Sequence, residues 1–333
     1  MDLVTGATGL SGSYLVCRLL KSGRRVRALH RPGSDLSWFH RIARFELGAN
    51  ADMLLQNLEW FEGDVIHADD VQDAVNGCER VYHTAALVSF RDGDKEELMR
   101  VNVGGTAHVV NACLYAQPQP ELCHFSSTAT MGKADGLIDE STTFVSDEDT
   151  SFYARSKYQA ELEAIRGREE GLKVAIINPC IILGFGNTDR GPSRFFRNAR
   201  KSFPFYPPGS NAFVDVRDVA DYAVDLMENK VFSNRFLCIG FNATYKAIFT
   251  QMAKEFNTQP PRIGVQPWMV EVAWRLTSVT RYLGIPSLIS RSSARAGMKL
   301  RSFSSAALIG QLGNQFTEQS ACIREHVARY QSE

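Results

Sequence analysis

The glycine-rich segment at residues 5–12, TGATGLSG, constrains the fold of this chain more than any other part of its sequence. It follows the apolar pair Leu3 and Val4. Apolar residues at helical spacing come after it: Tyr14, Leu15, Leu19 and Leu20. The glycines therefore lie where a strand turns into a helix, as in a parallel α/β sheet. Such a turn can bind phosphate, because free N–H groups and the positive dipole end of the helix point at it.

Each glycine of this segment has an expected role in binding a dinucleotide. Gly6 permits the tight turn, Gly9 lets the backbone approach a pyrophosphate, and Gly12 lets helix and strand pack closely. Thr8 and Leu10 lie between them and are expected to contact the same cofactor. Glycines at this spacing also occur in turns that bind no ligand, so the rest of the chain must support the interpretation.

The next predicted strand ends at His30, about where the adenosine ribose of a dinucleotide binds. An acidic residue there would hold the ribose 2′-hydroxyl of NAD, but the chain has His30 and Arg31, with no carboxylate before Asp35. Arginine can form two hydrogen bonds with the 2′-phosphate of NADP, which a carboxylate would repel. The sequence thus favours NADP over NAD. The alternative is that Arg31 is a solvated loop residue in a basic neighbourhood.

Composition argues against several function classes. Lys plus Arg and Asp plus Glu number 37 each, so no basic excess favours a nucleic acid or an anionic membrane as partner. The seven cysteines are dispersed without a Cys-x-x-Cys pair, which argues against a zinc site and a disulfide framework, and no metal is expected. No apolar run reaches the ~18 residues needed to span a bilayer, and no signal segment precedes the first strand. We therefore expect a cytoplasmic protein.

Short apolar runs alternate with helical periodicity up to about residue 178, which predicts an α/β fold with a doubly wound parallel sheet of the Rossmann type. The predicted strands are residues 3–5, 26–30, 58–61, 80–83, 123–127, 174–178 and 235–239, and the predicted helices begin near Gly9, Asp70, Lys95, Phe152 and Val216. Residues 1–178, with 211–242 returning to them, are expected to form the dinucleotide-binding domain. Residues 179–210 and 243–333 are expected to form a smaller, mainly helical substrate-binding part.

Glycines and prolines in residues 184–210 predict a long loop with little regular structure. Its aromatic residues are Phe195, Phe196, Phe203, Phe205 and Tyr206. We expect this loop either to form a wall of the substrate pocket or to be a surface loop that packs its own aromatic residues. Residues 267–282 predict an amphipathic helix that faces its own domain or contacts a membrane or a partner.

Tyr153 and Lys157 stand four residues apart in a predicted helix, so their side chains share one face. A lysine ammonium beside a tyrosine favours the phenolate and lowers a pKa that is ordinarily near ~10, which makes the phenol a usable proton exchanger. Such a pair occurs by chance in many helices. Here it follows a strand that ends in Ser126 and Ser127, at the sheet edge where α/β folds bind ligands. These residues together indicate hydride transfer.

The chain resembles the extended short-chain dehydrogenase/reductase family, whose motifs occur in it in the same order. The matching segments are the glycine-rich turn, Gly63-Asp64-Val65, His83-Thr84-Ala85-Ala86, Asn102-Val103-Gly104-Gly105-Thr106, Ser126-Ser127-Thr128, Tyr153 with Lys157, Pro179 with Gly184 and Gly186, and residues 213–220. The resemblance is closest to the branch that contains dihydroflavonol-4-reductase-like and 3β-hydroxysteroid-dehydrogenase-like enzymes. It covers nearly the whole chain.

The resemblance implies a role for each matched residue. Ser127 would hydrogen-bond the reacting oxygen, Tyr153 would exchange the proton, and Lys157 would bind the nicotinamide ribose and tune Tyr153. The expected cofactor contacts outside the glycine-rich turn are Arg31, Asp64, Val65, Ala85, Lys157 and Pro179. Two departures from the family pattern matter. Asn178 stands where the family often has arginine, and Thr128 could take the place of Ser127.

Members of this family reduce carbonyls, epimerise nucleotide sugars or dehydrate them, so fold alone does not select a reaction. Sugar dehydratases of the family typically have the residues Thr-Asp-Glu after the serine strand. This chain has Thr128 and Ala129 there and no carboxylate. Epimerases commonly show Val-Tyr-Gly where this chain has residues 130–132, TMG. We therefore expect an NADP-dependent reductase of a small carbonyl substrate. The alternatives are an epimerase with tightly bound NAD and a non-catalytic NADP-binding sensor, and many relatives are homodimers.

Overall fold

The computed structural model of the protein describes residues 1–132, 136–148, 150–269 and 297–333. Its centre is a seven-stranded sheet with the order β11-β7-β5-β4-β1-β2-β3, in which every neighbouring pair is parallel. The strands are β1 (Asp2–Thr5), β2 (Val26–His30), β3 (Leu58–Glu62), β4 (Arg80–His83), β5 (Glu121–Phe125), β7 (Val174–Pro179) and β11 (Arg235–Cys238). The sheet confirms the predicted doubly wound architecture.

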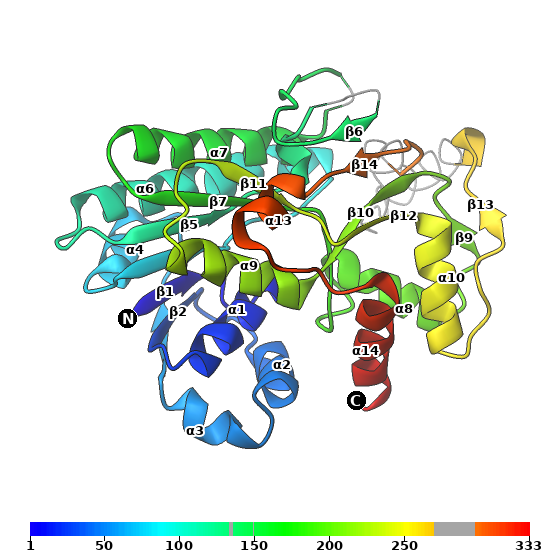
Figure 1. The fold of residues 1–333 in the computed structure, drawn as a ribbon, viewed down its shortest axis with the longest axis horizontal. Helices are drawn as coiled ribbons and strands as arrows, with labels where there is room; N and C mark the ends of the chain where they lie inside the picture. The colour runs from blue at the N-terminus through cyan, green and yellow to red at the C-terminus, as the bar shows by residue number, and fades with distance from the viewer. Residues whose placement is uncertain (133–135, 149, 270–296) are drawn as a thin grey trace.

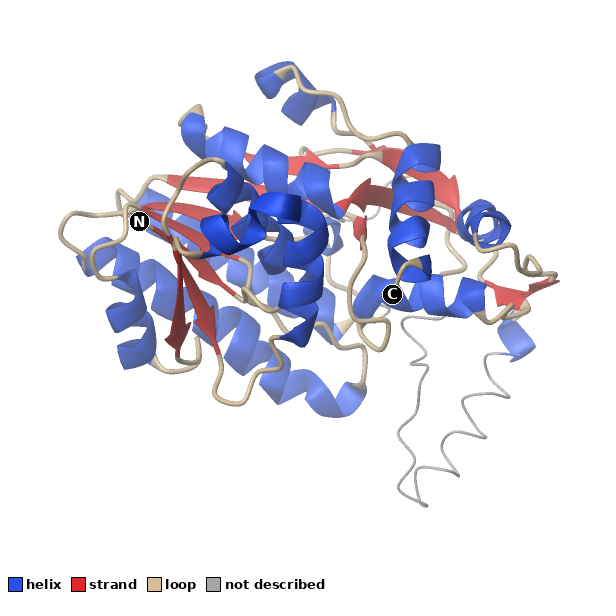
Figure 2. Cartoon of the chain, turned by 90° about the horizontal axis from the view of Figure 1, so that it is seen from below, coloured by secondary structure: helices blue, strands red, loops and turns tan. Residues whose placement is uncertain are grey.

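Helices cover both faces of this sheet (Figures 1 and 2). One face carries α1 (Leu10–Lys21), α2 (Ser37–Leu47) and α9 (Val216–Glu228), and the other carries α4 (Ala68–Val75), α6 (Gly105–Tyr115) and α7 (Phe152–Glu169). Side chains of the buried strands alternate between the two resulting cores. In β7, for example, Ala175 and Ile177 belong to one core and Val174 and Ile176 to the other. Two short helices, α3 (Ala51–Leu55) and α5 (Lys95–Leu98), complete this half.

Most of the remaining elements lie on the right of Figure 1, whereas α13 (Ala306–Leu312) packs against β11 near the centre of the view. A three-stranded sheet has the order β12-β10-β8, formed by β8 (Ile181–Leu183), β10 (Ser210–Asp215) and β12 (Phe241–Thr244). The helices of this part are α8 (Arg194–Arg200), α10 (Tyr245–Glu255), α13 (Ala306–Leu312) and α14 (Gln319–Gln331). Short parallel pairs join β9 (Phe205–Tyr206) to β13 (Ile263–Gly264) and β6 (Leu137–Ile138) to β14 (Ser302–Phe303).

Each of the seven predicted strands is present, with ends that differ from the prediction by at most two residues. The predicted helix starts also agree, since α7 begins at Phe152 and α9 at Val216. The segment 211–242 divides between the two parts of the molecule, because α9 and β11 join the main sheet while β10 and β12 form the three-stranded one. Most of the amphipathic helix predicted over residues 267–282 lies outside the described residues.

The prediction of a long loop over residues 184–210 was wrong. This segment contains α8 and β9, and β10 begins at Ser210. Its aromatic residues drive the difference, because they pack into the core of the C-terminal part: Phe196 is buried, and the ring of Phe195 packs edge-on against that of Phe249. Phe203 is exposed. A contribution of this segment to a substrate pocket stays a prediction.

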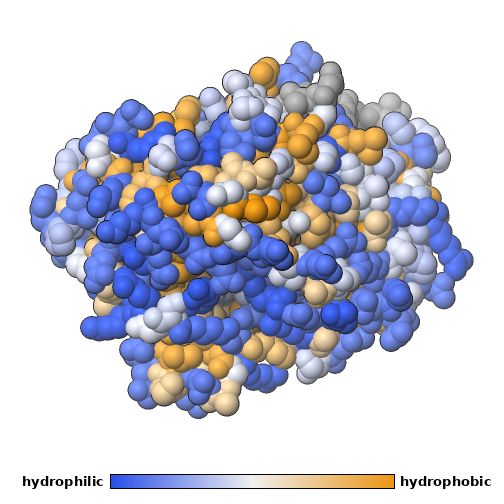
Figure 3. Space-filling model, viewed as in Figure 1, coloured by the Kyte–Doolittle hydropathy of each residue, from blue (hydrophilic) through white to orange (hydrophobic). Residues whose placement is uncertain are grey.

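All seven cysteines are buried and unpaired, which confirms that they serve as small core residues. In the described part of the chain, no helix combines the length and the apolar character that crossing a membrane requires. The face shown in Figure 3 is mostly hydrophilic, with hydrophobic residues gathered in a band across its middle.

Candidate active site

The glycine-rich turn between β1 and α1 is closed by contacts that leave no room for side chains. Gly6 has a φ of +68°, and a Cβ atom on it would lie 2.7 Å from the Cα atom of Ala85. A Cβ atom on Gly12 would lie 2.3 Å from the carbonyl oxygen of Gly6. Gly12 thus lets the start of α1 pack closely against the turn that directly follows β1. The N–H group of Gly9 donates to the same carbonyl at 2.9 Å.

The start of α1 fits the phosphates of a dinucleotide. Gly9 is the N-cap residue and offers no side-chain cap, and the first turn of the helix contains no acidic residue. The first N–H groups of α1, beginning with Leu10, are therefore available to an anion, and the dipole of the helix favours one. Thr8 is partly exposed and Gly9 exposed at the surface of the turn.

The other predicted cofactor residues lie at the carboxyl ends of neighbouring strands. Arg31 directly follows β2 and is exposed, and no ion pair engages its side chain within the described ranges. Asp64 and Val65 follow β3, and Ala85 follows β4. One carboxylate oxygen of Asp64 accepts a hydrogen bond from the Ile66 N–H group at 3.2 Å. These positions share one edge of the sheet, the edge where α/β folds bind ligands.

A directed chain of hydrogen bonds runs from the turn into the core. The hydroxyl of Thr106 donates to the carbonyl oxygen of Asn102 at 2.6 Å, so it must accept from Nε2 of His83 at 3.0 Å. The other ring nitrogen of His83, Nδ1, then accepts from the Thr5 hydroxyl at 2.8 Å. Thr5 in turn accepts from the Ala85 N–H group at 3.3 Å. His83 is therefore neutral with its proton on Nε2, and burial lowers its pKa to about 3.

Asn102 carries this chain on to the catalytic helix. Its amide nitrogen donates to the Ser156 hydroxyl at 2.9 Å, and Ser156 donates to the carbonyl oxygen of Tyr153 at 2.9 Å. The side-chain oxygen of Asn102 also accepts from the Leu87 N–H group at 2.7 Å. The glycine-rich turn and the first turn of α7 are thus linked through buried side chains.

The structure brings Ser127, Tyr153 and Lys157 together at the same sheet edge. Ser127 follows β5 and accepts a hydrogen bond from the Ala129 N–H group at 3.1 Å, and its side chain interacts with the Tyr153 phenol, whose pKa it lowers. Tyr153 is partly buried, with its ring edge-on to that of Phe90, whose centroid lies 5.5 Å away. Lys157 is buried, and its ammonium donates to the Phe125 carbonyl oxygen at 2.7 Å. The assignment of the substrate oxygen to Ser127 instead of Thr128 stays a prediction.

The pKa of Tyr153 differs from the prediction made from its spacing to Lys157. Burial raises this pKa, and the hydrogen bond from Ser127 opposes the increase only in part. The ammonium of Lys157 is bonded to Phe125 instead of lying against the phenol. Burial also lowers the pKa of Lys157 to about 8, opposed by the carboxylate of Glu161. Tyr153 is thus a protonated phenol at neutral pH.

Glu161 is a buried residue of this site that sequence reasoning missed. Its Oε2 atom accepts hydrogen bonds from Ser126 at 2.5 Å and from the amide of Asn178 at 2.6 Å. Its Oε1 atom pairs with Arg235 of β11 at 2.8 Å. The Asn178 amide also reaches the carbonyl oxygen of Ser127, at 3.3 Å. The carboxylate therefore fixes the turn that carries Ser127, and the nearby guanidinium comes from Arg235 instead of from position 178.

Pro179 ends β7, and the two glycines after β8 lie against the start of α1. A Cβ atom on Gly184 would lie 3.2 Å from Cδ1 of Leu10, and one on Gly186 would lie 2.8 Å from it. The segment expected to flank the nicotinamide therefore borders the glycine-rich turn.

Comparisons with known proteins agree with this geometry. The sequence model of the NAD dependent epimerase/dehydratase family matches residues 3–240. Sterol demethylase protein B from Methylococcus capsulatus is 34% identical over 275 residues, which cover 81% of this chain and 78% of that relative. Dihydroflavonol 4-reductase from Callistephus chinensis is 27% identical over 258 residues, which cover 72% of this chain and 69% of that relative. The crystal structure of gox2253 is 28% identical, with a TM-score of 0.79 over 100% of this chain and 98% of that one.

Proposed function

The chain belongs to the NAD-dependent epimerase/dehydratase family, within the extended short-chain dehydrogenase/reductases, and we propose that it is an NADP-dependent reductase of a ketone or aldehyde. The observation that carries this proposal is the grouping of Ser127, Tyr153 and Lys157 at the carboxyl edge of the sheet, beside a turn suited to phosphate. The product is a secondary or primary alcohol.

Each of these residues has a distinct task in the proposed reaction. Ser127 and Tyr153 hold the carbonyl oxygen of the substrate between their hydroxyl groups. The reduced nicotinamide, when bound, supplies a hydride to the carbonyl carbon. As negative charge develops on the oxygen, Tyr153 donates its phenolic proton to it, and the raised pKa of this residue keeps the proton available. Lys157 would hold the nicotinamide ribose by hydrogen bonds and would assist reprotonation of Tyr153.

NADP is the cofactor that Arg31 supports. This side chain is exposed directly after β2, free of ion pairs within the described ranges, at the strand end where the adenosine ribose is bound in such folds. A guanidinium there attracts a 2′-phosphate and gives no advantage to a 2′-hydroxyl.

Reduction is favoured over sugar dehydration by the groups beside Ser127. Thr128 and Ala129 provide no carboxylate that could remove or deliver a proton in an elimination. The nearest buried carboxylate described, Glu161, is held by Arg235, Ser126 and Asn178, so it is not free for acid–base chemistry. The relatives named as a sterol and a dihydroflavonol enzyme suggest bulky, largely apolar carbonyl compounds as the first substrates to test.

The test is a turnover assay that follows the absorbance of NADPH or NADH with a panel of sterol ketones, dihydroflavonols, simple aldehydes and UDP-sugars. We expect oxidation of NADPH with at least one carbonyl compound. Tyr153→Phe should lower kcat by about 10²–10⁴-fold while the protein still binds NADPH. Tyr158→Phe is a matched control on the same helix, because the Tyr158 ring stacks on Phe144 and its loss of a hydroxyl should leave kcat unchanged.

The same assay identifies the alternatives. Conversion of a UDP-sugar without net consumption of cofactor would establish the epimerase. Tight binding of NADPH with no turnover on any carbonyl compound would establish the sensor. Full turnover by Tyr153→Phe would remove the assigned proton donor.

A further inference from the structure

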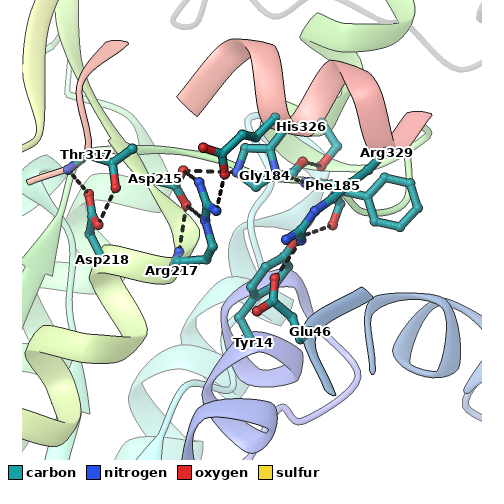
Figure 4. A network of polar contacts seen from close by, with 12 residues as sticks. Tyr14, Glu46, Gly184, Phe185, Asp215, Arg217, Asp218, Thr317, His326 and Arg329 are labelled. Atoms are coloured by element: carbon teal, nitrogen blue, oxygen red, sulfur yellow. Dashed lines mark hydrogen bonds and ion pairs between the residues drawn. The ribbon is translucent and has the colours of Figure 1, made fainter. Parts of the chain in front are cut away.

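The C-terminal helix α14 holds the short segment Gly184–Phe185–Gly186, which follows β8 (Figure 4). This segment has no regular structure, and side chains from α14 bond its backbone directly. Nδ1 of His326 accepts from the Phe185 N–H group at 3.1 Å. The Tyr330 hydroxyl accepts from the Gly186 N–H group at 2.8 Å. The Tyr330 hydroxyl can also donate its proton to the carbonyl oxygen of Gly186, 2.8 Å from the phenol oxygen, or to that of Gly184, 3.2 Å from it.

The same segment is bonded to α1 on its other side. The Tyr14 hydroxyl donates to the carbonyl oxygen of Phe185 at 3.2 Å. Arg329 of α14 donates to the Tyr14 hydroxyl at 3.0 Å and pairs with Glu46 of α2 at 2.5 Å. Figure 4 shows Arg329 between Tyr14 and Glu46, with Phe185 beside them. The segment is thus fixed between α14 and the helix that begins at the glycine-rich turn.

The orientation of His326 is set by Asp215. Since Nδ1 accepts from Phe185, the ring proton is on Nε2, which donates to an Asp215 carboxylate oxygen at 3.2 Å. Arg217 also bonds both oxygens of this carboxylate, at 3.0 and 2.7 Å. Asp215, His326 and Cys322 lie close enough together to hold a metal ion. The Asp215 carboxylate already accepts hydrogen bonds from Arg217 and His326 on both of its oxygens. We therefore interpret the cluster as the group that fixes the orientation of His326.

Contact between this segment and the glycine-rich turn is tight. Leu10, the first residue of α1, lies so close to Gly184 and Gly186 that a Cβ atom on either glycine would press against its side chain. Any displacement of residues 184–186 would therefore alter the position of Leu10, whose N–H group is among those free to bind phosphate.

We propose that α14 acts as a clasp: through Tyr330 and His326 it fixes residues 184–186 against Leu10, and it thereby sets the affinity for the pyrophosphate half of the dinucleotide. Tyr330 and His326 are positioning residues, since they act through the segment. The inference rests on the proposed dinucleotide site but not on the reaction proposed for it.

The test compares two ligands, NADPH and adenosine 2′-phosphate (2′-AMP), which has the adenosine and the 2′-phosphate but neither phosphate of the pyrophosphate bridge and no nicotinamide. Tyr330→Phe leaves the Gly186 N–H group without its partner, so we expect NADPH to bind about tenfold more weakly. Binding of 2′-AMP should change by less than about twofold. Both dissociation constants can be measured by isothermal titration calorimetry.

A matched control separates this effect from a general loosening of the C-terminal part. Tyr222→Phe removes a phenol that donates to the Asn314 carbonyl oxygen at 2.8 Å, far along the chain from residues 184–186. It should leave the affinity for both ligands unchanged. Two variants test His326. His326→Asn places an acceptor near the position of Nδ1 and should retain most of the affinity for NADPH. His326→Leu has no acceptor there and should lose affinity.

Equal NADPH affinity of Tyr330→Phe and the wild type would overturn the clasp. It would also be overturned if Tyr330→Phe weakened the binding of both ligands equally, or if Tyr222→Phe lost the same affinity for NADPH. A wild-type protein that binds NADPH but reduces no carbonyl compound would refute the proposed reaction and leave the clasp in place. If Tyr330→Phe does not fold, slower amide hydrogen exchange at Phe185 and Gly186 of the wild type on adding NADPH is the expected result, and unchanged exchange would count against the clasp.

Discussion

The side chain of Ser127 interacts with the phenol of Tyr153 and opposes the rise in its pKa, although one residue follows strand β5 and the other lies in the first turn of helix α7. Ser127 accepts from the Ala129 N–H group at 3.1 Å, which fixes one lone pair of its oxygen. The hydroxyl proton of Ser127 therefore remains free to point at the phenol or at a substrate oxygen between them.

Ser127→Ala should lower kcat by about 10²-fold, because it removes one of the two donors to the developing oxyanion. Thr128→Val is the matched control and should change kcat by less than about threefold, since Thr128 makes no described contact with Tyr153. Steady-state kinetics with the substrate found in the carbonyl screen measures both. A larger loss in Thr128→Val than in Ser127→Ala would transfer the role to Thr128.

The pH dependence of reduction should report Lys157, whose pKa burial lowers to about 8. The ammonium is charged below this pH and neutral above it, so its hydrogen bonds to the ribose weaken as the pH rises through about 8. Tyr153 stays protonated throughout, since its own pKa is raised. We expect kcat/KM to be level below about pH 8 and to fall above it. Lys157→Arg, which does not titrate in this range, should be less active and should lose the descending limb; retention of that limb would assign it to another group.

Sequence reasoning found the strands and the glycine-rich turn because their signals are local. A buried parallel strand such as β7 is a continuous apolar run, and Gly6 stands where a positive φ is needed. By contrast, α8 is only seven residues long and lies among glycines and prolines, so its periodicity was too short to detect.

The missed parts of the site depend on contacts between distant residues. Glu161 resembles any exposed acid of a charged helix, and only its pairing with Arg235, 74 residues away, accounts for its burial. The four-residue spacing of Tyr153 and Lys157 was correct in placing both side chains at one site. It could not show that Lys157 bonds to Phe125, nor that burial raises the pKa of Tyr153.

Arg31 should determine the choice between NADP and NAD. Arg31→Ser removes the guanidinium proposed to bind the 2′-phosphate, so the dissociation constant of NADPH should rise by about 10–100-fold while that of NADH stays nearly constant. Arg25→Ser is a suitable control, because Arg25 is also exposed but precedes the opposite end of β2. Fluorescence titration gives all the constants. If Arg31→Ser weakens both cofactors equally, or neither, Arg31 is a solvated loop residue.

His83 and His124 are both buried, with ring centroids 5.5 Å apart. They can be used to test how hydrogen bonding of a buried ring affects stability. The two nitrogens of His83 are hydrogen-bonded to Thr5 and Thr106. Neither nitrogen of His124 has a partner among the described residues. Burial lowers the pKa of both rings, to about 3 for His83.

His124→Leu should leave the free energy of unfolding unchanged or raise it by about 1–3 kcal/mol, because it removes two buried polar atoms without breaking a hydrogen bond. His83→Leu should lower it by about 2 kcal/mol or more, since Thr5 and Thr106 lose a partner. The two folded-state pKa values lie below the unfolded value of about 6.5, so the unfolded chain binds more protons and stability falls as the pH drops from about 6.5 toward 3. Removing His124 should make that decline shallower. Urea denaturation near pH 7 and near pH 5 measures both effects, and a His124→Leu variant less stable than the wild type at both values would show that this ring has a partner.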